Sequence, residues 1–315
     1  MPNPPYTWMN GAVVPWQDSR IHINTDVVLR GASVFEGIRA YRAAEGGDLR
    51  LFRAAEHLRR LLGTSARVLH LDLPYTVDDL RQATLELLRA NDIREHAHIR
   101  VVAYFDEPEL GDGGDTTGAF ILAFPRPHGT RLRSGIRSMV SAWRRPSDVS
   151  LPPRVKASGS YLNGRLAIAD ARSKGFDIPI LLNEAGKVSE GPGQNLFLVR
   201  DGVLVTPRVS DAILEGITRR TVLRLASDHG IPVQERAVDA TELYVADELF
   251  FAGTLIEIQP IVVIDSYVVG SGTMGPLTER IQDLYLATVT GRRDAPPEWF
   301  TSVYRAADVW STVSR

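Results

Sequence analysis

The chain has 315 residues, which is long enough to bury a large apolar core and to form two domains rather than one. Its 36 basic and 38 acidic residues leave a formal net charge of −2, so no general positive field favours nucleic acid or an anionic membrane surface. The chain contains no cysteine, which excludes disulfides, thiolate metal ligands and cysteine nucleophiles.

Targeting signals and membrane spans are also not expected. Residues 1–8 lack a basic region followed by an apolar stretch, so no secretory signal is predicted. The longest apolar runs, such as residues 119–124 and 261–264, are far too short to cross a bilayer. We therefore expect a cytoplasmic protein that interacts with neither membrane nor nucleic acid.

Strand and helix signals alternate in the first third of the chain. Asn10-Gly11 predicts a two-residue turn between two strands. Thr76, followed by Asp79, is typical of a capping box at a helix start. The other elements expected here are strands 6–9, 12–16, 33–41 and 48–52, a helix over 54–70, and strands 98–105 and 118–124.

Residues 125–133 interrupt this alternation, because they are rich in Pro, Gly and Arg and show no apolar period. They predict a connector at 126–134 between an N-terminal domain, 1–125, and a C-terminal domain, 135–315. The aromatic residues Trp299, Tyr304 and Trp310 predict that the C-terminal tail packs against the protein. The elements expected before it are strand 136–143, helix 162–174, strands 178–182, 195–199 and 203–206, helix 217–229, a β-rich region 248–269 and helix 277–288.

The chemically most informative residue is Lys156, in the small-residue segment Lys-Ala-Ser-Gly-Ser-Tyr161. Small neighbours suit an amine that a bulky planar reactant must reach. Glu190 follows in the glycine-rich segment 189–195, where a turn before a strand can hold its carboxylate rigidly. Either residue alone is more often a surface charge. Together they suit a pyridoxal phosphate (PLP) enzyme, in which the lysine forms a Schiff base and the acid keeps the ring nitrogen protonated.

These two segments resemble the class IV (fold type IV) aminotransferases, and the branched-chain aminotransferases most closely. Other segments look like the same family in the same order: 8–11, 31–39, 56–61, 216–219 and 253–258. The resemblance implies an α/β (α+β) protein with a smaller open α/β N-terminal domain and a larger pseudo-barrel C-terminal domain. It also implies a PLP-dependent aminotransferase that exchanges an amino group between an amino acid and a 2-oxo acid in a ping-pong cycle.

The resemblance assigns Lys156 as the catalytic residue and implies a set of cofactor contacts. Gly216-Ile217-Thr218 starts a predicted helix, whose free N–H groups favour a phosphate. Asn195 is expected to orient Glu190. The cofactor-binding residues so predicted are Arg60, Gly216, Thr218 and Thr254 for the phosphate, Glu190 for the ring nitrogen, Tyr161 for the phenolic oxygen, Leu214 and Ile217 for the ring faces, and Lys156.

The predicted substrate pocket departs from the branched-chain enzymes. Arg30 and His98 replace tyrosines of that family, and Arg126 replaces a tryptophan. Buried arginines are costly unless paired, so one interpretation is that Arg30, Arg100 and Arg126 face an acidic or strongly polar substrate. The other is that Arg30 or Arg126 faces solvent, or pairs with Asp112 or Asp115 across a dimer. The full set of predicted substrate contacts is Arg30, Phe35, His98, Arg100, Arg126, Thr254 and Leu255.

Two other functions remain open at this stage: a PLP-dependent lyase of the aminodeoxychorismate lyase type, and a D-amino acid or (R)-amine aminotransferase. The segment 33–37 favours the aminotransferase that is similar to the branched-chain enzymes. No metal site is expected. The resemblance further implies a homodimer or higher homo-oligomer, in which residues 110–115 of one subunit complete the pocket of the other.

Overall fold

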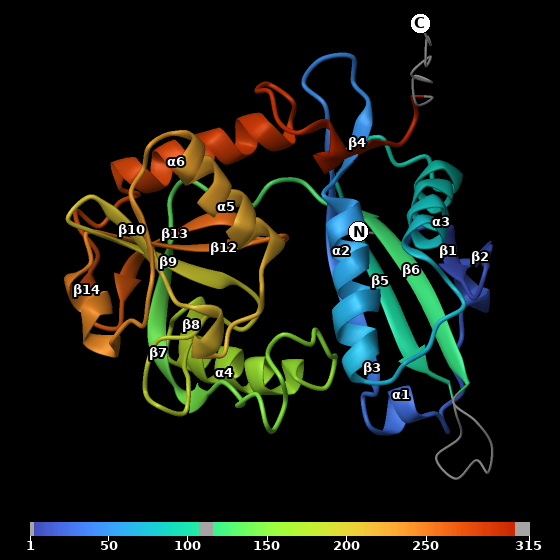
Figure 1. The fold of residues 1–315 in the computed structure, drawn as a ribbon, viewed down its shortest axis with the longest axis horizontal. Helices are drawn as coiled ribbons and strands as arrows, with labels where there is room; N and C mark the ends of the chain where they lie inside the picture. The colour runs from blue at the N-terminus through green and yellow to red at the C-terminus, as the bar shows by residue number, and fades with distance from the viewer. Residues whose placement is uncertain (1–2, 107–115, 306–315) are drawn as a thin grey trace, which may run out of the picture.

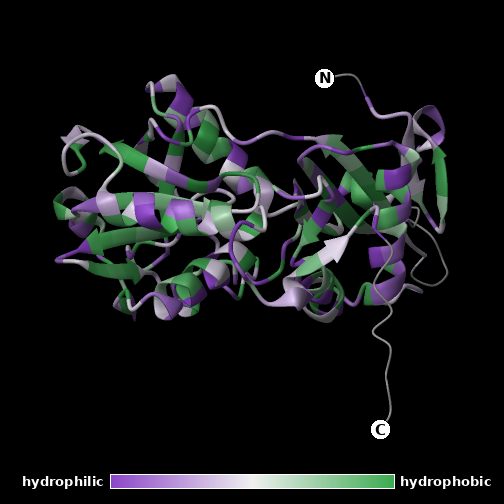
Figure 2. Ribbon diagram, turned by 90° about the horizontal axis from the view of Figure 1, so that it is seen from above, coloured by the Kyte–Doolittle hydropathy of each residue, from purple (hydrophilic) through white to green (hydrophobic). Residues whose placement is uncertain are grey.

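The computed structural model describes residues 3–106 and 116–305. Two β-sheets lie side by side, and each is covered by its own helices (Figure 1). The strands of both sheets are largely hydrophobic, whereas the helices mix hydrophobic and hydrophilic residues (Figure 2). Within the described residues, no helix is both long and apolar enough to cross a membrane.

The first sheet consists, in spatial order, of β15 (Phe300–Ser302), β4 (Leu49–Phe52), β3 (Ser33–Arg42), β5 (Ala97–Phe105), β6 (Thr117–Pro125), β1 (Tyr6–Met9) and β2 (Ala12–Pro15). α2 (Ala54–Arg60) packs against β3, and α3 (Val77–Ala90) packs against β1, β2 and β6. α1 (Asp26–Leu29) lies near β5.

Alternation along β3 gives this strand two different surfaces. Val34, Ile38 and Ala40 enter the core beneath the helices. Phe35 and Gly37, on the opposite face, line a cavity between the two sheets. The chemistry-bearing side of the first sheet is therefore the side that faces the second sheet.

The second sheet consists, in spatial order, of β11 (Val233–Glu235), β10 (Val203–Thr206), β9 (Asn195–Arg200), β12 (Glu248–Gly253), β13 (Glu257–Ile264), β7 (Ile136–Arg144) and β8 (Ile178–Leu182), with β14 (Tyr267–Val268) paired to β13. α5 (Ile217–Asp228) and α6 (Pro276–Val289) pack against β12, and α4 (Tyr161–Ser173) packs against β7 and β8.

Both faces of β9 are buried, which explains its continuous apolar sequence. Leu196 and Leu198 belong to one hydrophobic core, and Phe197 and Val199 belong to another. Asn195, at the start of this strand, is 5% exposed and is held at the cavity. The strand is thus a rigid support for the segment that contains Glu190.

Most predicted elements are present, with bounds that differ by a few residues. Asn10 and Gly11 form the expected turn with φ values of 47° and 100°, and Thr76 and Asp79 form the capping box. The helix expected over 54–70 is an α-helix only to Arg60 and continues as a π-helix over Leu61–Ala66. π-Helical turns are rare and are frequently found at functional sites.

The C-terminal segment crosses back to the first sheet, where β15 pairs with β4. Trp299 is buried and Tyr304 is half-buried, as we expected of the tail, while Trp310 lies outside the described residues. We propose the division into domains 1–125 and 135–315 with a connector at 126–134. The strand β15 shows that the last described residues nevertheless complete the N-terminal sheet.

Candidate active site

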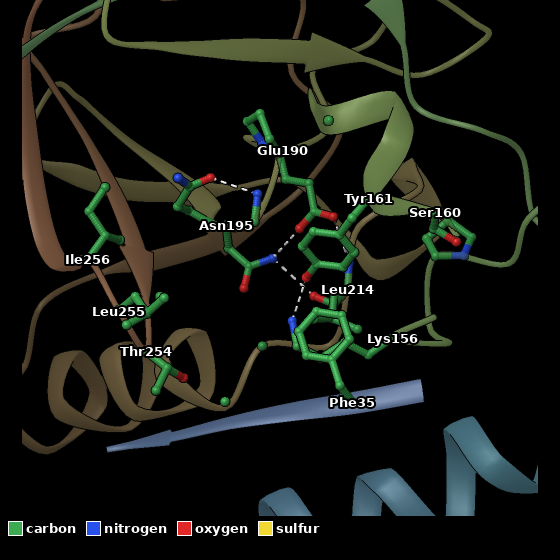
Figure 3. A pocket seen from close by; sticks show the side chains of 18 of the residues that line it. Phe35, Lys156, Ser160, Tyr161, Glu190, Asn195, Leu214, Thr254, Leu255 and Ile256 are labelled. Carbon is green, nitrogen blue, oxygen red and sulfur yellow. Dashed lines mark hydrogen bonds between the residues drawn. The ribbon is translucent and has the colours of Figure 1, made fainter. Parts of the chain in front are cut away.

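A cavity of about 580 Å³ lies between the two sheets. This volume is within the range of ordinary ligand and cofactor sites. All of the residues that we predicted to contact a cofactor line it: Arg60, Lys156, Tyr161, Glu190, Leu214, Gly216, Ile217, Thr218 and Thr254. The sequence motifs thus converge on one place, although the residues come from three helices, α2, α4 and α5, and from loops that are far apart in the sequence. Figure 3 shows how Lys156, Tyr161, Glu190, Leu214 and Thr254 lie around this cavity.

Lys156 is held at the junction of the two sheets by backbone hydrogen bonds. Its carbonyl accepts from the N–H of Phe35 at 3.0 Å, and the N–H of Ser158 donates to Ser33 at 2.8 Å. The N–H of Lys156 donates to the hydroxyl of Ser65, on the π-helical turn, at 3.0 Å. The backbone that carries the amine is consequently fixed by hydrogen bonds on both sides.

The chain has only three lysines, and their surroundings differ. Lys174 pairs with Asp170, and Lys187 pairs with Asp239, both at the surface. Only Lys156 lines the cavity. It is therefore the one primary side-chain amine that a ligand in this cavity can reach.

The amine of Lys156 lies among aromatic groups. Its Nζ donates to the hydroxyl of Tyr161 at 2.5 Å and lies 4.8 Å from the ring centre of Phe35 (Figure 3). The rings of Phe35 and Tyr161 are themselves 4.8 Å apart. Tyr161 can therefore hold the amine in place and can offer a hydroxyl to a ligand oxygen beside it.

Glu190 is 3% exposed, and each carboxylate oxygen has polar partners. Oε2 accepts from the amide of Asn195 at 2.8 Å, the orienting contact that we expected (Figure 3). Oε1 accepts from the N–H of Leu214 at 3.2 Å. Burial raises the pKa of Glu190 above its ordinary value, although nearby cations oppose this. A further cation at this carboxylate would favour its ionised form.

Arg145 is a residue of the cavity that we did not predict. Its guanidinium lies 2.7 Å from Oε1 of Glu190, and it also lines the cavity. The residue follows the predicted strand 136–143, and nothing in its local sequence distinguishes it from a surface arginine. Its pairing with Glu190 depends on how β7 lies in the sheet, which the sequence alone does not specify.

Arg60 reaches the cavity from α2 and is bound to a buried carboxylate. Its Nε and Nη2 donate to Glu36 at 2.6 and 2.9 Å, and its Nη1 donates to the carbonyl of Glu215 at 2.6 Å. Burial alone would raise the pKa of Glu36, but Arg60 and His57 lower it to about 2. Since a guanidinium has five N–H donors, one donor on each Nη remains for a ligand oxygen.

The start of α5 forms a second wall of the cavity. Gly216 precedes the helix, and no side chain caps it. A Cβ on Gly216 would overlap with Oδ1 of Asn195, so a larger residue would displace the amide that orients Glu190. Thr218 and Thr254 add hydroxyl groups to the same cavity. Free helix N–H groups, hydroxyls and an arginine are a suitable donor set for a phosphate.

These residues fit pyridoxal phosphate. Phosphate donors, a buried carboxylate and a single reachable lysine line one cavity. Leu214 and Ile217 contribute apolar side chains that suit the faces of a planar ring. Within the described residues, no group of His, Asp and Glu is arranged to hold a metal ion.

The predicted substrate contacts fall into two groups. Phe35, His98, Arg100, Thr254 and Leu255 line the cavity. Arg30 follows α1 and is 56% exposed, with an ion pair to Asp26, and Arg126 is exposed just after β6. Neither lines the cavity of the single chain. The segment 110–115, expected to complete a neighbouring pocket, lies outside the described residues.

Two arginines of α4, which we did not foresee, also reach the cavity wall. Arg165 and Arg172 lie four and eleven residues after Tyr161 in the sequence, and all three line the cavity. Such spacing puts side chains on one face of a helix. The signal was therefore present once Tyr161 had been assigned, but the sequence did not show how far the cavity extends along α4.

His98 is a polar residue of the cavity whose hydrogen-bonding groups are unmatched in the described part of the chain. Both ring nitrogens are buried and have no partner within the described residues. Burial, together with the cations of Arg100, Arg39 and Arg126, lowers its pKa to about 3. The imidazole is consequently neutral at neutral pH and can offer one donor and one acceptor to a substrate.

The lowered pKa of His98 predicts acid-sensitive stability. The folded protein leaves His98 unprotonated below pH 6.5, whereas the unfolded chain binds a proton there, so stability falls as pH drops from about 6.5 toward 3. We expect His98→Gln to reduce the slope of the free energy of unfolding against pH by about 1 kcal/mol per pH unit in this range. Urea unfolding at several pH values measures it. His22→Gln, at an exposed imidazole, is the control, and an equal slope in the wild type and His98→Gln would contradict the expectation.

Comparisons with known proteins agree with this geometry. Residues 33–264 match the family model of class IV aminotransferases. A probable branched-chain-amino-acid aminotransferase of Aquifex aeolicus is 40% identical over 304 residues, which cover 95% of this chain and 97% of the relative. The branched-chain-amino-acid aminotransferase of Escherichia coli K12 is 37% identical over 304 residues, which again cover 95% of this chain and 97% of the relative.

Solved structures give the same result. The branched-chain aminotransferase of Thermoproteus uzoniensis, solved with norvaline, has a TM-score of 0.90 and 41% identity, with 95% of this chain and 99% of that chain covered. The enzyme of Thermobaculum terrenum in its PLP form has a TM-score of 0.90 and 39% identity, with 96% and 99% covered. The chain therefore belongs to the class IV aminotransferases, which are PLP-dependent enzymes of fold type IV.

Proposed function

We propose that the cavity around Lys156 binds pyridoxal phosphate and transfers an amino group from an amino acid to a 2-oxo acid. The observation that carries the proposal is the placement of Lys156. It is the only lysine of the chain that lines the cavity. Its amine is hydrogen-bonded to the hydroxyl of Tyr161, and the buried Glu190 lines the same cavity. A lysine and a fixed carboxylate are the two groups that this cofactor chemistry requires of a protein.

When bound, pyridoxal phosphate supplies an aldehyde that takes up an amino group and a ring that stabilises negative charge at the reacting carbon. Lys156 binds the aldehyde between turnovers and, once released, moves a proton at the substrate α-carbon. Glu190 holds a proton on the ring nitrogen, with Arg145 and Asn195 fixing its carboxylate. Because one cavity serves both half-reactions, we expect ping-pong kinetics.

A spectrophotometric test with single donors examines this function. Adding an L-amino acid without an acceptor should remove the absorbance of the aldehyde form of the cofactor and release one 2-oxo acid per subunit. A 2-oxo acid added afterwards should restore the absorbance. Conversion by D-amino acids or (R)-amines only, or release of pyruvate from a substrate without restoration by an acceptor, would replace the proposal with one of the other two functions.

For the substrate, we propose a preference for acidic or polar side chains, set by Arg100 and His98. Arg100 stacks on Phe35, with its guanidinium carbon 4.8 Å from the ring centre. No ion pair of Arg100 is present within residues 3–106 and 116–305. An unpaired guanidinium at the cavity is a partner for a substrate carboxylate. The relatives are named for branched-chain amino acids, whose aliphatic side chains offer no acceptor to the guanidinium of Arg100.

Replacing Arg100 with glutamine tests this preference. A charge-assisted hydrogen bond contributes about 1.5–3 kcal/mol, which corresponds to a selectivity of roughly 10- to 100-fold. We expect kcat/KM for acidic donors other than glutamate to fall by this factor and kcat/KM for leucine to change little. Arg30→Gln and Arg126→Gln are matched controls, since neither residue lines the cavity. A wild-type enzyme that already prefers leucine, with Arg100→Gln unchanged, would rule the preference out.

We also propose that the enzyme works as a homodimer. Large apolar side chains beside the cavity are exposed in the single chain: Leu151 at 45%, Leu162 at 62% and Leu166 at 41%. A two-fold interface over this region would bury them. Sedimentation should give at least a dimer, and Leu162→Glu should weaken it, whereas Val268→Glu, at an equally exposed site on β14, should not. A fully active monomer would contradict the proposal.

A further inference from the structure

A second cavity, of about 640 Å³, lies apart from the active site and shares no lining residue with it. It opens where the end of β3, the start of the interdomain segment and the end of α6 meet. Its polar lining consists of Arg42, Glu95, His96, His128, Thr290 and Arg292. None of these residues has a role in the function proposed above.

The charge of this second cavity is predominantly positive. Arg42 and Arg292 line this cavity together with one carboxylate, Glu95, and neither arginine has an ion pair in the part of the chain that the structure describes. Burial is the main cause that lowers the pKa of His96 to about 4, and the nearby His128, Arg39 and Arg42 add to this effect. A site where cations outnumber anions is favourable for a bound anion.

The imidazoles of His96 and His128 form the inner wall. Nδ1 of His96 accepts from the N–H of Arg42 at 2.9 Å, so the proton of a neutral His96 is on Nε2 and is available to a ligand. The two imidazole rings are 4.6 Å apart. Nδ1 of His128 lies 2.9 Å from both carboxylate oxygens of Glu257.

Glu257 connects this wall to the active site. It is 1% exposed and has a left-handed backbone, with φ of 58°, which is strained for a residue other than glycine. Tyr41 donates to it at 3.0 Å, and Arg39, which is 1% exposed, lies 3.8 Å away without a hydrogen bond of its own within the described residues. Glu257 immediately follows residues 254–256, which line the active-site cavity.

We propose that the second cavity is a binding site for a small anion that carries a carboxylate or phosphate group. The anion contacts Arg42, Arg292 and His96, and it competes with Glu257 for a hydrogen bond from the ring of His128. Glu257 then keeps only its contacts with Tyr41 and Arg39. Because residues 254–256 directly precede Glu257, they shift with it at the active site. An anion in the second cavity in this way changes the position of Thr254 in the active-site cavity.

The experiment uses enzyme whose cofactor has been fixed to Lys156 by borohydride, so that added anions cannot enter the phosphate site. Failure of this fixation would count against the proposed function and not against the second site. Inorganic phosphate and succinate are titrated separately by calorimetry, which distinguishes the two anion types. We expect saturable binding of at least one of them, with a dissociation constant of about 1 mM or lower.

Variants assign the binding to the second cavity. The double variant Arg42→Gln, Arg292→Gln should weaken it at least about 10-fold, whereas Arg293→Gln, next in the chain but not lining the cavity, should not. Succinate should also shift the phosphorus NMR resonance of the fixed cofactor, and the double variant should lose this shift at the same succinate concentration, which excludes a shift caused by succinate at Arg100. No saturable binding, or binding that the double variant leaves unchanged, overturns the site. Binding without a phosphorus shift overturns its transmission to the active site.

Discussion

Replacing Lys156 with alanine is expected to lower kcat by on the order of 10⁴-fold, because the variant loses both the amine that binds the aldehyde and the group that moves the proton. Cofactor binding should persist, since Arg60, Thr218 and the start of α5 are unchanged. Steady-state kinetics measures the first effect, and equilibrium dialysis of the cofactor measures the second.

The matched controls for this variant are Lys174→Ala and Lys187→Ala. Both lysines are the same chemical group, but they form surface ion pairs away from the cavity. A surface ion pair contributes about 1 kcal/mol or less to stability, so both variants should retain wild-type turnover. If Lys156→Ala kept most of its activity, or if either control lost it, the catalytic assignment would be wrong.

Replacing Glu190 with glutamine should have the second largest effect. Glutamine keeps the shape and the contact with Asn195 but removes the negative charge that holds a proton on the ring nitrogen. We expect kcat to fall by on the order of 100-fold, the usual cost of removing one preorganised electrostatic group. The absorbance of the bound cofactor should change as well, which a purely structural effect on folding would not produce.

Two further variants separate charge from structure. Glu184→Gln removes an exposed carboxylate from the segment between β8 and β9 and should change neither kcat nor the spectrum. Glu190→Gln also leaves Arg145 buried without its ionic partner, which lowers stability. Arg145→Gln should therefore restore part of the melting temperature in the double variant while kcat stays low. Recovery of kcat in the double variant would show that the loss was structural.

Local sequence patterns predicted much of the fold and of the site. The turn at Asn10-Gly11, the capping box at Thr76 and the helix after Gly216 are each encoded within a few neighbouring residues, and each is present. The segments of Lys156 and Glu190 are similarly compact. For this reason the predicted cofactor residues could be named before their position in space was known.

Contacts that depend on how distant segments meet could not be predicted in the same way. Arg145 reaches Glu190, and Arg60 reaches Glu36, only because β7, β3 and α2 adopt particular positions. Whether an arginine near the pocket faces the cavity or solvent depends on the same positions. Arg100 lines the cavity, whereas Arg126, just after the neighbouring strand β6, does not. The short strand β15 has too few residues for its alternation to be recognised.

Borohydride reduction of the cofactor-loaded enzyme, followed by peptide mapping, shows directly which lysine binds the cofactor. Reduction makes the bond between the lysine and the cofactor permanent, and the chain offers only three lysines as sites of attachment. We expect one cofactor per subunit, attached to Lys156. A label on Lys174 or Lys187, or no label on an enzyme that turns over, would contradict it.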